Sequence, residues 1–250
     1  MVNTGTVNWN GGNITLSNGA NFQNDGIFNA NATTTLAGGD MDRFTNNGSF
    51  FKKTAATTTT VNIPFTNNGT VEVAAGSLVF LRDIDNGENA VIDLAGGSLD
   101  PGDTLTLGSD DSLVGSGTLS ANLVNGGTVS PGASPGKITV DGDYTQNEGG
   151  TLDIQLGGTT AETGYDQLVV TGTATMEGTL NVSLINDFTP QVGQEFSIIT
   201  HTTGTGEFDT VNLPTLTGGL SLEIAFSDPE VTLTVVNGGG YTIFLPLILR

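Results

Sequence analysis

The side chains that could do chemistry in this sequence are first of all carboxylates in short turns. They are Asp83, Asp85, Asp100, Asp103, Asp110 and Asp111. Turn carboxylates and backbone carbonyls are oxygen ligands that Ca²⁺ prefers, and a pair of carboxylates can hydrolyse a glycosidic bond. The Gly- and Asp-rich nonapeptide repeat of Ca²⁺-binding β-rolls is absent. We therefore interpret these turns as solvated and keep Ca²⁺ as the one candidate ion.

Other catalytic arrangements find little support in the residues. Cysteine is absent, and the single histidine, His201, stands in a loop rich in Thr and Gly. The cations that a polysaccharide lyase would use are scattered, at Arg43, Lys52, Lys53, Arg82 and Lys137. We expect no enzyme, no catalytic residue and no cofactor, with a glycan-binding or glycan-cleaving protein as the alternative.

The charge balance argues against two classes of partner. The chain has 6 Lys and Arg against 26 Asp and Glu, a formal net charge of −20. Nucleic-acid binding needs basic surface that neutralises phosphates, and anionic membranes are disfavoured for the same reason. No segment reaches the ~18 apolar residues of a membrane span, and the first residues lack the pattern of a signal peptide. We expect no nucleic-acid partner and no membrane span.

The elements that must position any site come from a short repeat. An Asn-rich turn, a glycine and a β-type stretch recur in the first half, with the glycines at Gly5, Gly26, Gly48 and Gly69. Their spacing of 21, 22 and 21 residues is typical of a solenoid whose repeats stack on one another. Strand residues and turn formers without a helical period predict an all-β parallel β-helix with coils of about 21 residues.

Each coil is expected to turn one face of its strands inward. Residues 7–9, 13–16 and 70–73 alternate as half-buried strands do, whereas 77–81 is an apolar run that predicts burial on both faces. Asn side chains at equivalent corners can form ladders between coils. An internal aromatic stack is expected from Trp9, Phe22, Phe28, Phe44, Phe50, Phe51, Phe65 and Phe80.

The period changes along the chain. It becomes irregular from about Asn89, and a turn-rich segment at 130–136 precedes longer strands. We therefore expect regular coils at 1–129, a wider continuation of the solenoid at 130–236 with a small antiparallel cap, and an apolar β strand at 237–250 that follows a glycine hinge.

The stretch from Ser130 to Val236 resembles the distal passenger region of autotransporter-type bacterial surface proteins. The residues that carry the resemblance are Ser130–Gly136, Gly142–Gln146, Gly149–Leu152, Tyr165–Ala174, Gly178–Val182 and Val231–Val235. The resemblance implies a right-handed parallel β-helix that is secreted and exposed on the bacterial cell surface. It implies no shared catalytic residues, because activities in such proteins usually lie on inserted domains.

The C-terminal tail is the strongest candidate for an interaction site. Its candidate interface residues are Tyr241, Ile243, Phe244, Leu245, Leu247, Ile248 and Leu249. Three interpretations stay open: a strand that caps its own solenoid, a strand donated to a neighbouring subunit by β-augmentation, and a sorting or anchoring signal. The first two need a hinge, which Gly238–Gly240 supplies.

The ends of a β-helix are unpaired edges that template further pairing unless they are capped. We therefore expect an extracellular structural protein whose partner is a second copy of itself, stacked head to tail into a fibre or surface layer, with the tail bridging subunits. The alternatives are a monomeric adhesin or stalk segment of a surface passenger, with cell-surface glycans as its partners, and a glycan-active β-helix.

Overall fold

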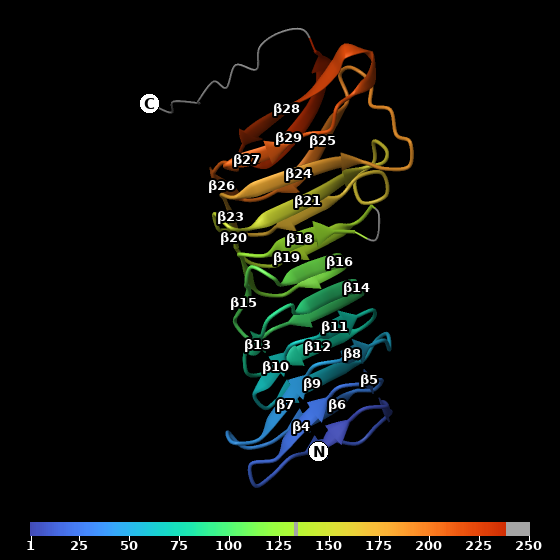
Figure 1. Cartoon of the computed structure of the whole chain (residues 1–250), viewed down its shortest axis with the longest axis vertical. Helices are drawn as coiled ribbons and strands as arrows, with labels where there is room; N and C mark the ends of the chain where they lie inside the picture. The colour runs from blue at the N-terminus through green and yellow to red at the C-terminus, as the bar shows by residue number, and fades with distance from the viewer. Residues whose placement is uncertain (133–134, 239–250) are drawn as a thin grey trace.

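The computed structural model describes residues 1–132 and 135–238 as an elongated stack of β coils. Figure 1 shows the coils piled along the long axis, with the N-terminus at one end and the last strands at the other. The strand ladders that join one coil to the next are parallel. The predicted all-β parallel β-helix is confirmed.

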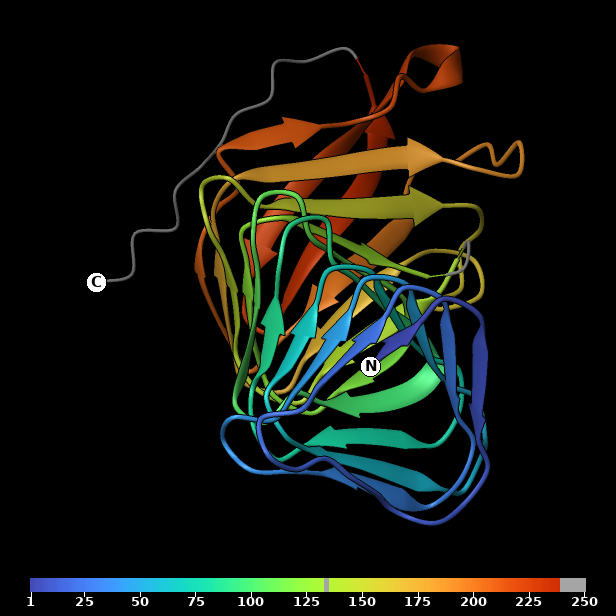
Figure 2. The ribbon, with the colours of Figure 1, turned by 60° about the horizontal axis from the view of Figure 1, so that its bottom comes forward.

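Three faces make up the wall (Figure 2), and the strands of a face stack in register, with one interruption on face 1. Face 1 contains β1 (Val2–Asn3), β4 (Asn21–Asn24), β7 (Arg43–Asn46), β10 (Phe65–Asn67), β13 (Ile84–Asn86), β15 (Thr104–Leu107), β17 (Asn122–Asn125), β20 (Tyr144–Gln146), β23 (Thr173–Met176) and β26 (Thr203–Gly206). Face 2 contains β2 (Thr6–Trp9), β5 (Ile27–Ala30), β8 (Ser49–Lys52), β11 (Thr70–Val73), β18 (Thr128–Pro131), β21 (Thr151–Leu156), β24 (Thr179–Leu184) and β27 (Thr210–Asn212). Face 3 contains β3 (Ile14–Thr15), β6 (Thr34–Ala37), β9 (Thr58–Asn62), β12 (Ser77–Phe80), β19 (Lys137–Val140), β22 (Gln167–Val170) and β25 (Glu195–Thr200). Two long strands, β14 (Val91–Asp100) and β16 (Ser112–Leu119), run around the corner from face 2 to face 3.

Alternation along each strand decides which side chains enter the core, because successive residues point to opposite faces. Aromatic rings stack inside the first coils: Phe22, Phe44 and Phe65 on face 1, and Phe28 and Phe50 on face 2. The stacked rings lie 5.0 to 5.2 Å apart, close to the spacing of the coils themselves. The predicted internal stack is confirmed except at Phe51, which points outward beneath the Lys53 ammonium.

One strand prediction is wrong. The run at 77–81 was expected to be buried on both faces, but β12 buries only Leu78 and Phe80, while Ser77 and Val79 are half-exposed. The wall of this solenoid is one sheet thick, so the outward side chains of β12 have no second layer to cover them.

Asparagines hold the corner between faces 1 and 2. Asn3 donates to Asn24 (2.6 Å), Asn24 to Asn46 (2.7 Å) and Asn46 to Asn67 (2.9 Å). Each of the three donors also reaches a backbone carbonyl of the next coil, as Asn46 reaches Thr70 at 3.0 Å. The predicted Asn ladder is confirmed, and its buried amides satisfy backbone groups that the turns leave without a strand partner.

Coil length changes along the stack. Thr6 pairs with Ile27, a step of 21 residues, whereas Ile138 pairs with Leu168, a step of 30. The position 129/130, where a boundary was expected from the sequence, falls inside β18, which pairs with β16 before it and β21 after it. The face-2 ladder is therefore continuous across that position.

An antiparallel hairpin closes face 3 at the C-terminal end. It is formed by β28 (Leu220–Ser227), which follows the 3₁₀ turn η1 (Thr217–Gly219), and by β29 (Glu230–Asn237), which pairs antiparallel with β25. The expected antiparallel cap is present. The apolar segment expected as a C-terminal β strand lies, from residue 239 onward, outside the described residues.

Candidate functional site

The first coil presents an open β edge at the N-terminal end of the stack. Within the described residues, β2 pairs with β5 and with no other strand. The Ile27 N–H donates to the Gly5 carbonyl at 2.8 Å. Because residues of a parallel strand alternate in the side to which they hydrogen-bond, Val7 faces β5, and the backbone groups of Thr6 and Asn8 face the open side.

This edge lacks the usual protection of a β edge. Natural edge strands carry charged side chains that discourage pairing with another chain. Residues 1–24 contain no Asp, Glu, Lys or Arg, although the whole chain contains 32 such residues, 6 basic and 26 acidic. Met1 and Val2 are 84% and 57% exposed. The N-terminal end therefore combines available backbone hydrogen-bonding groups with apolar surface and no charge repulsion from side chains.

The C-terminal end presents two further open edges. Within the part of the chain that the structure describes, β26 pairs only with β23, and β27 pairs only with β24. The Thr210 N–H donates to the Gly178 carbonyl at 3.0 Å, so Asp209 and Val211 face the open side. Neither β26 nor β27 contains a charged residue. The hairpin continues face 3, and its turn also reaches β26 of face 1, where the Asp228 carboxylate accepts from the Gly204 N–H at 2.6 Å. On face 2, β27 pairs with neither strand of the hairpin.

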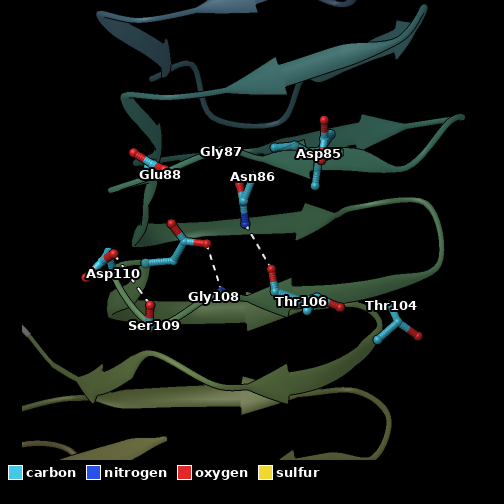
Figure 3. A pocket seen from close by; sticks show the side chains of 11 residues that line it. Asp85, Asn86, Gly87, Glu88, Thr104, Thr106, Gly108, Ser109 and Asp110 are labelled. Carbon is cyan, nitrogen blue, oxygen red and sulfur yellow. Dashed lines mark hydrogen bonds between the residues drawn. The ribbon is translucent and has the colours of Figure 1, made fainter. Parts of the chain in front are cut away.

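A hollow of about 630 Å³ lies midway along the stack, on face 1 (Figure 3). It marks the place where the face-1 ladder stops, since β13 pairs with β10 and β15 with β17, but β13 and β15 form no ladder with each other. Asp85, Glu88, Asp110 and Asp111 are among its lining residues. Three of the aspartates predicted as turn acids thus contribute to one acidic hollow.

The acids of this hollow do not converge as metal ligands do. Asp111 is buried and accepts hydrogen bonds from the N–H groups of Ala90 (2.8 Å) and Gly108 (2.9 Å), so it serves the backbone. In residues 1–132 and 135–238, no group of three His, Asp or Glu side chains is placed to hold a metal ion. The other predicted turn acids, Asp83, Asp100 and Asp103, lie outside the hollow.

His201 is buried beneath the turn of the C-terminal hairpin. Its Nδ1 lies 3.6 Å from an Asp228 carboxylate oxygen and makes no hydrogen bond within the described residues. Burial lowers the pKa of His201, and the charges of Asp228 and Glu230 partly oppose the shift. A Gly-x-Ser-x-Gly match occurs at 132–136, but it connects β18 to β19, whereas a nucleophile elbow connects a strand to a helix. Its Ser134 lies outside the described residues.

The predicted basic residues stay apart. Lys53, Arg82 and Lys137 form surface ion pairs with Glu72, Asp40 and Glu162. Lys52 instead enters the core, and its ammonium donates to the Thr54 carbonyl and the Thr57 hydroxyl, both at 2.6 Å. Burial lowers the pKa of Lys52. Turn oxygens satisfy this cation, which therefore fastens a loop.

The predicted interface residues of the tail, from Tyr241 to Leu249, lie outside the described residues. The open edges of β2 and β27 are the functional feature that the sequence reasoning located only in general terms, as solenoid ends. The absence of charge from residues 1–24 was a signal that could have identified the N-terminal edge.

Comparison with known proteins adds no family. No protein-family model matches the chain, and a search of the curated proteins finds no match. No described helix is long and apolar enough to cross a membrane. The resemblance to autotransporter passengers stays a prediction.

Proposed function

We propose that this chain is a structural protein that assembles end to end into an extracellular fibre or surface layer. The observation that carries the proposal is the pair of uncharged open β edges at opposite ends of the stack, on β2 and β27 (Figure 1). Stacking of one copy on another would give these edges the parallel neighbours that the other face-2 strands have. A head-to-tail contact of this kind does not close on itself and builds an open polymer.

The composition of the wall supports a structural role. Inward side chains of face 2 are fully buried from Phe28 to Leu180, so each coil relies on its neighbours for burial. The hollow on face 1 is lined mainly by polar residues, and two of them bind the backbone: Asp111 accepts from the Ala90 and Gly108 N–H groups, and Asn86 donates to the Thr106 carbonyl. The extracellular setting rests on the resemblance to surface passengers.

The test is negative-stain electron microscopy with sedimentation velocity of the intact chain over a wide range of protein concentration. We expect rods to join end to end, with a sedimentation coefficient that grows with concentration. Single short rods that persist at every concentration would overturn the proposal. A matched chain without Tyr241–Arg250 separates assembly through the coil edges, which the deletion preserves, from assembly that needs the tail.

A monomeric stalk or adhesin segment of a surface passenger is the second candidate. The C-terminal hairpin favours it, because β28 and β29 end the parallel ladder of face 3 and limit stacking there. In that case the edge of β2 would be covered by other coils of a longer passenger. Single rods that bind cell-surface glycans would support this candidate.

A further inference from the structure

We propose that a second copy docks in one register, with its β2 as the next strand after β27, so that Thr6, Val7 and Asn8 pair with Thr210, Val211 and Asn212. This inference rests on the proposed end-to-end assembly and specifies its contact. The first three residues of β2 are the same as the three residues of β27, Thr-Val-Asn. Thr151, Thr179 and Thr210 already stack at the first of these positions within the chain.

Backbone geometry agrees with this register and excludes a shift by one residue. On β27, Asp209 and Val211 offer their backbone groups to the open side, and on β2 the residues that do so are Thr6 and Asn8. Pairing of Thr6 with Thr210 lets the Thr6 N–H reach the Asp209 carbonyl. The same pattern occurs inside the chain, where the Thr210 N–H reaches the carbonyl of Gly178, the residue before Thr179. A shift by one residue would turn each outward side chain inward.

The inward side chains fit the same register. Val7 and Val211 stand at the two ends of one row of inward side chains along face 2, and both are only partly buried. Phe28 and Leu180, next to them in this row, are fully buried. Each terminal valine has a stacked neighbour on one side, Phe28 for Val7 and Leu180 for Val211. Contact between the two valines would complete the row and remove the exposed apolar area of both from water.

The outward asparagines of the two edges can form one more hydrogen bond of the ladder, with the donor and the acceptor on the required sides. Asn29 donates its side-chain N–H to the Asn8 oxygen at 2.8 Å, and Asn212 donates to the Asn181 oxygen at 2.8 Å. The donor in both rungs belongs to the later coil. Within the described residues, the Asn8 side-chain amide donates to no group, and the Asn212 oxygen accepts from none. Docking therefore brings a donor to an acceptor and repeats the existing rung.

Paired cysteines test this register, and the chain contains no other cysteine. The first in-register pair is Asn8→Cys with Asn212→Cys, and the second is Thr6→Cys with Thr210→Cys. The matched control is Thr6→Cys with Asn212→Cys, which is displaced by two residues along the strand. Strands lie about 4.8 Å apart, within the ~4.4–6.8 Å between Cα atoms that a disulfide spans, whereas the displacement adds about 6.6 Å along the strand.

Mild oxidation followed by non-reducing electrophoresis gives the result. We expect both in-register pairs to form ladders of covalent multimers at least about tenfold faster than the control pair, whose geometry is unfavourable. Equal rates for all pairs, or filaments without cross-links in the in-register pairs, would overturn the register and leave end-to-end assembly standing. Single rods without cross-links would overturn both.

Discussion

At the scale of single residues, buried aspartates bind the backbone of neighbouring coils. Asp42 accepts from the Ala20 N–H at 2.7 Å and Asp111 from the Ala90 N–H at 2.8 Å, each one coil away. Asp166 accepts from Gly136 and Gln155, both at 2.8 Å. Part of the acidic composition is therefore structural, because carboxylates supply acceptors where the turns leave N–H groups without a strand partner.

We expect the buried carboxyl of Asp166 to make stability depend on pH. It is fully buried, and burial raises the pKa of its carboxyl from 3.8 to about 6, against the opposing effect of its two backbone hydrogen bonds. A raised folded-state pKa favours the protonated form. The stabilisation that Asp166 gives to the folded state is therefore fully present below the pKa of the unfolded chain. It is lost as the pH rises to about 6. At about 1.4 kcal/mol per pKa unit, the loss in free energy of unfolding is about 3 kcal/mol.

Substitution of Asp166 measures this contribution. We expect the original chain to lose about 3 kcal/mol in free energy of unfolding between about pH 4 and pH 7, and Asp166→Asn to lack this loss. Urea unfolding followed by circular dichroism at both pH values gives the difference. The exposed Asp103→Asn removes the same charge and should keep the original pH dependence. A pH dependence that is unchanged in Asp166→Asn would contradict the assignment.

We expect the buried Asn ladder to contribute more to stability than the exposed one beside it. Asn46 is fully buried and bonds to Asn24, Asn67 and the Thr70 carbonyl. We expect Asn46→Ala to lower the free energy of unfolding by about 2–3 kcal/mol, because it leaves buried polar groups without partners and opens a small cavity.

The neighbouring exposed ladder provides the matched control for Asn46. Asn68 bonds to Asn47 at 2.9 Å on the surface, so Asn68→Ala should cost no more than about 0.5 kcal/mol. Chemical denaturation of the two variants under the same conditions makes the comparison. Equal losses would show that burial does not distinguish the two ladders.

At the scale of elements, the face-1 ladder is interrupted between β13 and β15, and we expect this junction to be the least stable of the stack. The inner Asn ladder fails one step earlier, between β10 and β13: the Asn67 side-chain amide and the Asn86 side-chain oxygen are both buried and lack hydrogen-bond partners within the described residues. The reason is the corner that follows. It takes three residues from Asn67 to Thr70 but five from Asn86 to Val91, although Thr70 and Val91 pair.

Hydrogen exchange should locate this junction. We expect the backbone amides of 84–90 and 104–111 to exchange faster than those of 43–49 and 65–71, because the latter belong to the uninterrupted part of the face-1 ladder. Exchange read by mass spectrometry on peptides covers all four segments of one sample. Equal protection across the four would show that the interruption of the face-1 ladder has no effect on local stability.

Much of this architecture could be predicted from local sequence. The Asn-x-Gly corners fixed the period of the first four coils, since Asn and Gly suit tight corners, and the aromatic alternation fixed the inward face. The junction at β13 could not be predicted, because the register of Asn86 depends on how a longer corner closes in space. In the coil after Asn86, Leu107 occupies the position of the ladder asparagine and has no side-chain amide. This difference can be recognised only once the coils are aligned.

The candidate site was harder to predict than the fold. A solenoid has two ends in any sequence, but which strands form open edges depends on the C-terminal hairpin, which covers face 3 and spares β27. The equivalence of Thr6–Asn8 and Thr210–Asn212 follows from the ladder registers and cannot be read from their spacing, because coil length changes from 21 to 30 residues between them.

At the scale of the whole molecule, the net charge opposes end-to-end assembly, whereas the uncharged β edges favour it. Two copies that each carry −20 repel one another, whereas the first coil brings no charged side chain to the contact. Salt therefore screens the repulsion without weakening the docking itself. The screening length falls from about 30 Å at 0.01 M salt to about 10 Å at 0.1 M, so repulsion between ends should be strong only at low salt.

Assembly should therefore increase with ionic strength. We expect the fraction of end-to-end oligomers, measured by sedimentation velocity, to rise severalfold between about 0.01 M and 0.2 M NaCl. A contact built on ion pairs would respond in the opposite sense, so a decrease with salt would contradict an uncharged interface. CaCl₂ at matched ionic strength separates screening from binding: an equal effect indicates screening, and a much larger effect would show that Ca²⁺ bridges acidic turns between copies.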